Sequence, residues 1–320
     1  MPHESVGATG RPASTAPTPS APAPADPRGD SRIHDIGYRH YDGERLGRSY
    51  VRRSLFTQSL RGAYGLGRSA KSKVLPMILF AVMCAPALVI DAVAIYTHMT
   101  KLPIQYTSYP IYLQAVIGLY LAAQAPQSVS RDLRFKTVPL YFSRPMERVD
   151  YVVAKFGAMA SALFLLTGVP LLILYIGALL GKLDFGAQTA GFGKGLLGVA
   201  LLSLLFGGIG LVLAALTPRR GFGVAAVIAV LTISYGAVSS IQGVAFEQGN
   251  HAVIGWLGLF SPITLIGGVQ SWWLGAQSEF VGGQGPGSAL AGTVYLLVVL
   301  GLIAGSFALL MRRYRKVGLG

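Results

Sequence analysis

The sequence is poor in charged residues and in cysteine. Asp, Glu, Lys and Arg make up 12% of the 320 residues, against 52% that are hydrophobic, and the mean hydropathy is +0.53. Soluble domains carry about 25% charged residues, so this composition excludes an ordinary soluble domain and indicates a protein that crosses a membrane several times. The single cysteine, Cys84, excludes a disulfide framework and a cysteine-based metal site within one chain.

Motifs for nucleotide binding and catalysis are also missing. The nearest approach to a P-loop is Gly177-Ala-Leu-Leu-Gly-Lys-Leu183, which is one residue short and lacks the Ser or Thr that holds magnesium. There is no nucleophile elbow, no HExxH pair, and no ligand-like spacing among the five histidines. We therefore expect no enzymatic activity and no cofactor in this chain.

Basic residues nevertheless exceed acidic ones, giving a formal charge of +14. They occur in short blocks that flank apolar runs, which is a membrane-topology signal rather than the pattern of a nucleic-acid groove, so we expect no nucleic-acid partner. Residues 1–31 are rich in Pro, Ala, Ser and Thr, which predicts a disordered tail.

Residues 32–73 form a basic cytoplasmic segment ahead of the first apolar run. On a helical wheel Leu46, Tyr50, Phe56, Leu60 and Tyr64 share an arc, whereas Val51 and Leu55 fall outside it. This pattern predicts an amphipathic helix at the inner headgroup layer, held there by apolar insertion and by anionic membrane lipid. The alternative is an ordinary positive flank with no helix at the interface.

The remaining region, 74–320, contains six runs long and apolar enough to cross the hydrocarbon layer as helices, each needing about 20 residues. We expect the six transmembrane helices at 74–96, 109–125, 151–180, 193–216, 221–241 and 289–311. With both termini cytoplasmic, all but three of the 27 Lys and Arg residues fall on the inner side, the exceptions being Lys101, Lys182 and Lys194. The sequence therefore predicts an all-α integral membrane protein of the cell inner or plasma membrane.

A seventh apolar stretch, 252–275, raises the question of a seventh membrane span. A seventh crossing would place the basic residues 312–316 outside, and Ser261-Pro262 would break a simple span. We therefore expect two short helices that form an outer re-entrant hairpin before the last helix. Because backbone that turns at membrane depth must be covered by protein or water, this hairpin should pack against the bundle.

Asp91 is the one clear acid inside a predicted span. Intramembrane acids are candidates for a proton or cation relay or for contact with a polar substrate. The alternative is a shallow side chain that reaches the outer headgroups or bonds to a neighbouring helix.

The loop 127–150 is a charged island between the second and third predicted spans. It contains Asp132, Lys136-Thr137, Leu140 and Ser143-Arg-Pro145, and it is followed by Tyr151 and Lys155. This order resembles the first cytoplasmic loop of the type-2 ATP-binding-cassette (ABC) exporter permeases. Two departures are Asp132, where the family more often has Glu, and Lys136-Thr137 in place of Gly-Thr.

The resemblance implies the transmembrane subunit of an ATP-driven exporter, with ATP and magnesium bound by a separate nucleotide-binding ATPase subunit. It also implies pairing with a second permease subunit, in a homodimer or a heterodimer. The apolar spans themselves would suit a lipophilic or amphipathic cargo. The residues implied to dock on the ATPase are Ser130, Arg131, Asp132, Arg134, Phe135, Lys136 and Thr137.

Two other functions stay open from the sequence. A secondary transporter or channel without an ATPase partner would be expected to show broken helices in two repeats and ionisable residues at the midplane, and only Asp91 points that way. A membrane enzyme or scaffold would show a cluster of catalytic polar residues, which the sequence lacks.

Overall fold

A computed structural model describes residues 46–67, 69–135, 141, 146–217, 219–283 and 285–316, together with Gly43. The chain divides into two units, 1–44 and 45–320, and every element described below belongs to the second. The described residues contain helices and no strand. The predicted tail 1–31 lies outside the described residues, as do Lys136 and Thr137.

Five long apolar helices confirm five of the six predicted spans. Each has at least 27 residues, hence a length of about 40 Å at 1.5 Å per residue, which exceeds the roughly 30 Å of a hydrocarbon core. They are α2 (Ala70–Tyr96), α7 (Arg148–Leu180), α8 (Phe185–Leu216), the continuous helix made by α9 (Arg220–Ile228), the π-helical turn η2 (Ala229–Ile233) and α10 (Ser234–Glu247), and finally α13 (Ala289–Lys316).

The predicted span at 109–125 is built differently. It consists of short helical segments in succession: α3 (Tyr109–Tyr112), α4 (Gln114–Ala125), the π-helical turn η1 (Pro126–Ser130) and α5 (Arg131–Arg134). Pro126 explains the π-helical turn, because its ring lacks an N–H donor and would clash with the carbonyl four residues earlier in a regular α-helix. The sixth span therefore stays a prediction.

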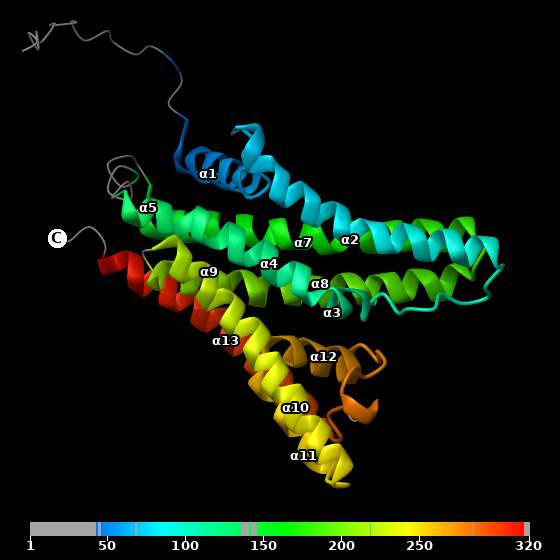
Figure 1. Cartoon of the computed structure of the whole chain (residues 1–320). Helices are drawn as coiled ribbons and strands as arrows, with labels where there is room; N and C mark the ends of the chain where they lie inside the picture. Colours follow the sequence, from blue (N-terminus) through cyan, green and yellow to red (C-terminus); the bar gives the residue numbers. More distant parts are fainter. Residues whose placement is uncertain are drawn as a thin grey trace, which may run out of the picture. The chain divides into compact units, whose positions relative to one another are not determined.

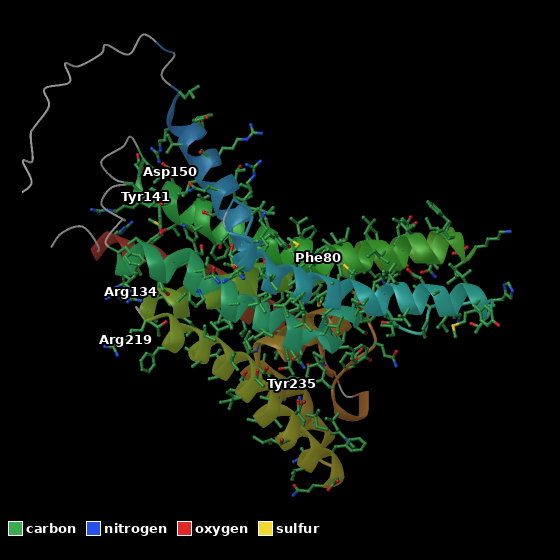
Figure 2. The ribbon with its side chains drawn as sticks, turned by 45° about the horizontal axis from the view of Figure 1, so that its top comes forward. Phe80, Arg134, Tyr141, Asp150, Arg219 and Tyr235 are labelled. Carbon is green, nitrogen blue, oxygen red and sulfur yellow. The ribbon has the colours of Figure 1, made fainter. Side chains whose placement is uncertain are left out.

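The helices α7 and α8 form the centre of the bundle and are the most buried of the long helices. The first helix, α1 (Arg48–Ala63), and α2 pack on α7, α13 packs on α8, and α4 packs on α9 (Figure 1). The start of α7, the segment α5 and the end of α13 lie at one end of this bundle, which we call the charged end (Figure 1). Its exposed basic residues include Arg134 and Arg219 (Figure 2), and Arg313 near the end of α13.

The helix α1 lies within the predicted basic segment, and its place at the headgroup layer stays a prediction. Leu55 is buried and Val51 packs beside it, whereas Leu46 and Tyr50 of the predicted arc are exposed. The burial of Leu55 follows from the packing of α1 on α7, which the helical wheel of α1 alone could not include. Tyr64 secures the end of the helix by donating a 2.8 Å hydrogen bond to the carbonyl of Ala162.

The stretch before the last long helix contains two short helices, as predicted. They are α11 (His251–Leu257), extended by the 3₁₀ turn η3 (Gly258–Phe260), and α12 (Pro262–Trp273). The break falls at Ser261, which is buried in an extended conformation just before Pro262. Most of α12 is buried, largely against α13 and α8, so protein covers the turn. Its re-entry from the outer face stays a prediction.

Candidate functional site

The candidate site is the region where η1 and α5 meet α1 and the start of α7 at the charged end. The chain runs from α4 through η1 directly into α5, so the predicted docking segment begins as a continuation of the membrane helix. Ser130 anchors this continuation by donating a 2.7 Å hydrogen bond from its hydroxyl to the carbonyl of Ala214 near the end of α8. The position of α5 is thereby coupled to α8.

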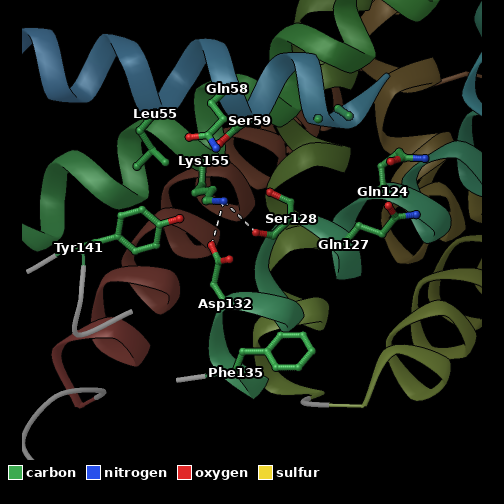
Figure 3. Close-up of a pocket in the computed structure, with 12 residues that line it drawn as sticks. Leu55, Gln58, Ser59, Gln124, Gln127, Ser128, Asp132, Phe135, Tyr141 and Lys155 are labelled. Atoms are coloured by element: carbon green, nitrogen blue, oxygen red, sulfur yellow. Dashed lines mark hydrogen bonds and ion pairs between the residues drawn. The ribbon is translucent and has the colours of Figure 1, made fainter. Parts of the chain in front are cut away.

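A charged network joins α5 to α7. The ammonium nitrogen of Lys155 lies 2.9 Å from Oδ2 of Asp132 and also donates a 2.9 Å hydrogen bond to the carbonyl of Ser128 (Figure 3). Tyr151 donates from its hydroxyl to the same Oδ2 of Asp132 at 2.7 Å. The side chains of Lys155 and Asp132 are only 11% and 18% exposed, so their charges are stabilised mainly by each other and by these hydrogen bonds.

Tyr151 also connects this network to the last helix. Its ring is fully buried and lies 4.8 Å from the ring of Tyr314 in α13 and 5.5 Å from that of Tyr141, measured between centroids. Aromatic pairs at this separation add stabilisation beyond the area they bury. One side chain therefore connects α5, α7 and α13.

A second set of charges fixes α1 on the start of α7. Glu147 and Asp150 form a reciprocal capping box, which satisfies backbone N–H groups in the first turn of α7. Arg48 of α1 donates to both of these carboxylates, and Arg52 lies 3.7 Å from Asp150. The hydrogen bond with Asp150 raises the pKa of Arg48.

A cavity of about 270 Å³ opens between α1 and this network (Figure 3). Its walls carry amide side chains from three elements, Gln58 of α1, Gln124 of α4 and Gln127 of η1, and Lys155 and Asp132 contribute charge. Nothing in this lining resembles a catalytic set, and no group of three or more His, Cys, Asp or Glu residues suits a metal ion in the described part of the chain.

The predicted docking residues divide into internal and exposed ones. Ser130 and Asp132 make the internal contacts described above, whereas Arg134 and Phe135 are exposed at the end of the helical run. The guanidinium carbon of Arg134 lies 5.8 Å from the centroid of the Phe135 ring. Arg131 belongs to α5 but its side chain is outside the described set, and Lys136 and Thr137 lie outside the described residues altogether.

Asp91 lies far from this cluster, in the second half of α2. The residue is 6% exposed, and it packs against Gly177 of α7, where a Cβ atom would come within 2.0 Å of its carboxyl carbon. Its Oδ1 atom has no hydrogen-bond partner among the described residues. The carboxylate therefore lies in a space that exists because position 177 has no side chain.

Several residues of the site were not singled out from the sequence. The capping box of Glu147 and Asp150 has a recognisable spacing and could have been found. Tyr151 and Lys155 were part of the resemblance but had no assigned role. Arg48 and Tyr314 carried no local signal, because their partners lie 102 and 163 positions away along the chain.

This arrangement defines a polytopic helical membrane protein whose polar residues gather at one end of the bundle, and the sequence comparison identifies the class. Residues 55–319 match the model of the ABC-2 family transporter proteins. A comparison with curated proteins gives no match. Because the family match covers most of the chain, this protein belongs to the ABC-2 transporter family. The matched region is its permease domain, a transmembrane component that is not a catalytic domain.

Proposed function

We propose that this chain is the permease subunit of an ATP-driven exporter and that it works with a separate nucleotide-binding ATPase subunit. Membership of the ABC-2 family supports an ATPase partner. In this proposal ATP and magnesium bind the ATPase subunit, and the permease contributes the membrane path.

The observation that carries the proposal is the coupling of α5 to the long helices. Arg134 and Phe135 are exposed at the charged end, and only two residues before them Asp132 is held by Lys155 and Tyr151 of α7. Breaking a buried ion pair by displacing one partner is costly, at about 3 kcal/mol or more. A push on α5 would therefore move the start of α7 rather than be absorbed by the loop.

The same proposal gives the orientation in the membrane. The charged end lies in the cytoplasm, with both termini, because all but three of the Lys and Arg residues belong to segments that the positive-inside rule assigns to the inner side, and α1 lies at the inner surface. The helical run made by α3 and α4, from Tyr109 to Ala125, is then the second of six spans, and α11 with α12 is the outer re-entrant hairpin. The burial of α12 against protein supports this placement.

A second permease subunit, identical or related, completes the proposed transporter. The helix formed by α9, η2 and α10 is the least buried of the long helices and exposes large apolar residues such as Phe222, Ile233 and Val244. In a membrane such a face contacts lipid or another subunit. A lipophilic or amphipathic cargo is compatible with these apolar surfaces.

Co-expression and co-purification with a candidate P-loop ATPase, sought in the neighbouring reading frames, test the docking surface. Arg134→Glu with Phe135→Ala should reduce recovery of the ATPase about tenfold or more, because a charge and an aromatic anchor are removed from the contact. Lys101→Glu, at the other end of the bundle, is the matched charge-reversal control and should recover the ATPase as the wild type does. Full recovery, with normal stimulation of ATP hydrolysis, in the first variant would refute docking at α5.

The alternative is a secondary transporter without an ATPase, and the buried Asp91 is the observation that favours it. Under that alternative Asp91→Asn should abolish uptake or efflux driven by an ion gradient. Under the proposed function the variant should retain ATP-dependent transport in vesicles, since Asn fits the same space beside Gly177. Comparing transport driven by ATP with transport driven by a proton or sodium gradient separates the two functions.

A further inference from the structure

A groove between the ends of α8 and α13 combines an apolar floor with a basic rim. It has a volume of about 250 Å³ and lies outside the network that holds α5. Ala215 and Leu310 are buried in its floor, while Leu216 and Leu309 are 60% and 53% exposed. Arg312 and Arg313 line the same groove at the end of α13 (Figure 1 shows this end beside α8).

Neither arginine has an ion-pair partner among the residues that the structure describes. The sequences of α8 and α13 contain no Asp or Glu. Arg219, just beyond the end of α8, adds positive charge at the same end of the bundle. The groove therefore suits a ligand with an anionic head and an apolar tail.

We propose that this groove is a binding site for an anionic phospholipid. The phosphate would contact the guanidinium groups of Arg312 and Arg313, which offer paired N–H donors suited to phosphate oxygens. An acyl chain would cover Leu216 and Leu309, which are otherwise exposed. The site does not depend on the cargo or on the ATPase, and positive charge at this end places it at the cytoplasmic leaflet, where anionic lipids give a negative surface potential.

Native mass spectrometry of the full chain in detergent tests the site with two lipid probes. Phosphatidylglycerol should bind more tightly than phosphatidylcholine of the same acyl chains, because only the former has a net negative charge. Arg312→Gln with Arg313→Gln should weaken phosphatidylglycerol binding roughly 30-fold, since each basic residue near an anionic headgroup contributes about a fivefold factor. The matched control, Lys101→Gln with Lys194→Gln, removes two exposed charges at the opposite end of the bundle and should keep the affinity.

A second variant tests the apolar half without changing charge. Leu309→Trp projects a larger side chain from an exposed position into the groove and should lower the affinity for phosphatidylglycerol severalfold while α13 stays folded. Equal binding of the two lipids, or an equal loss in the Lys101 and Lys194 control, would overturn the proposal. So would crosslinking of two copies through Leu309→Cys in a Cys84→Ala background, which would make the groove a subunit interface.

Discussion

At the charged end of the bundle the buried carboxylates are paired with basic side chains from distant elements, whereas at the opposite end Asp91 is buried with no ionic partner among the described residues. Asp132 lies against Lys155, and Asp150 against Arg48, each pair joining two different elements. Asp91 instead fits into the space left by Gly177. The comparison indicates that ion pairs connect separate elements at one end, while close helix packing accommodates the buried carboxylate at the other.

The largest effect should come from breaking the pair between α5 and α7. Lys155→Met should lower the free energy of unfolding by about 3 kcal/mol, because Asp132 keeps its buried charge and loses its cation. The measurement is denaturant unfolding in mixed micelles. At the opposite end the exposed Lys194→Met should change stability by less than about 0.5 kcal/mol.

Adding Asp132→Asn to Lys155→Met sharpens this test. The double variant should recover most of the lost stability, since no uncompensated charge remains buried. If the double variant is as unstable as Lys155→Met alone, the pair is not the source of the effect.

Filling the space beside Asp91 should have the next largest effect. Gly177→Ala should destabilise the protein by about 2 kcal/mol, because the new Cβ would overlap the carboxyl group of Asp91. Gly193→Ala in α8, where a Cβ would meet nothing within 4 Å, is the matched control and should stabilise its helix slightly. Thermal unfolding in detergent compares the two variants. Asp91→Ala in the Gly177→Ala background should restore stability, and failure to do so would contradict the packing account.

A smaller effect is expected from single tyrosine hydroxyls at the two ends. Tyr151→Phe should cost about 1.5 kcal/mol, because a buried hydrogen bond to the charged Asp132 is lost. Tyr175→Phe, which removes an exposed hydrogen bond to Thr189, should cost less than about 0.5 kcal/mol. Equal losses in chemical denaturation would show that burial at the charged end does not strengthen its hydrogen bonds.

The smallest effect should come from Arg48, whose ion pairs are partly exposed to solvent. Arg48→Gln should lower the melting temperature slightly in low salt, and the difference from wild type should shrink as salt is added. Arg53→Gln, an exposed α1 residue without an ion pair in the described part of the chain, should show no such salt dependence. A salt-independent loss at Arg48 would mean that its packing matters more than its charge.

Much of the fold could be predicted from the sequence, and less of the site. Five spans were found near their observed bounds, and the break at Ser261-Pro262 was recognised from the proline. The order of Asp132, Tyr151 and Lys155 was read as a family pattern, but not as three side chains in contact. The packing of Leu55 of α1 against the bundle was not foreseen, since the helical wheel could not include α7.

The sequence alone determined which segments are apolar enough to cross a membrane and where the basic residues lie, because transfer into hydrocarbon depends on the composition of each local segment. Only the tertiary structure decided which charges are paired and which glycine makes room for Asp91. It also decided that Arg312 and Arg313 border an apolar groove. The physical reason is that these features arise where helices meet. Their partners lie from 23 to more than 80 positions apart in the sequence, beyond the reach of any local periodicity.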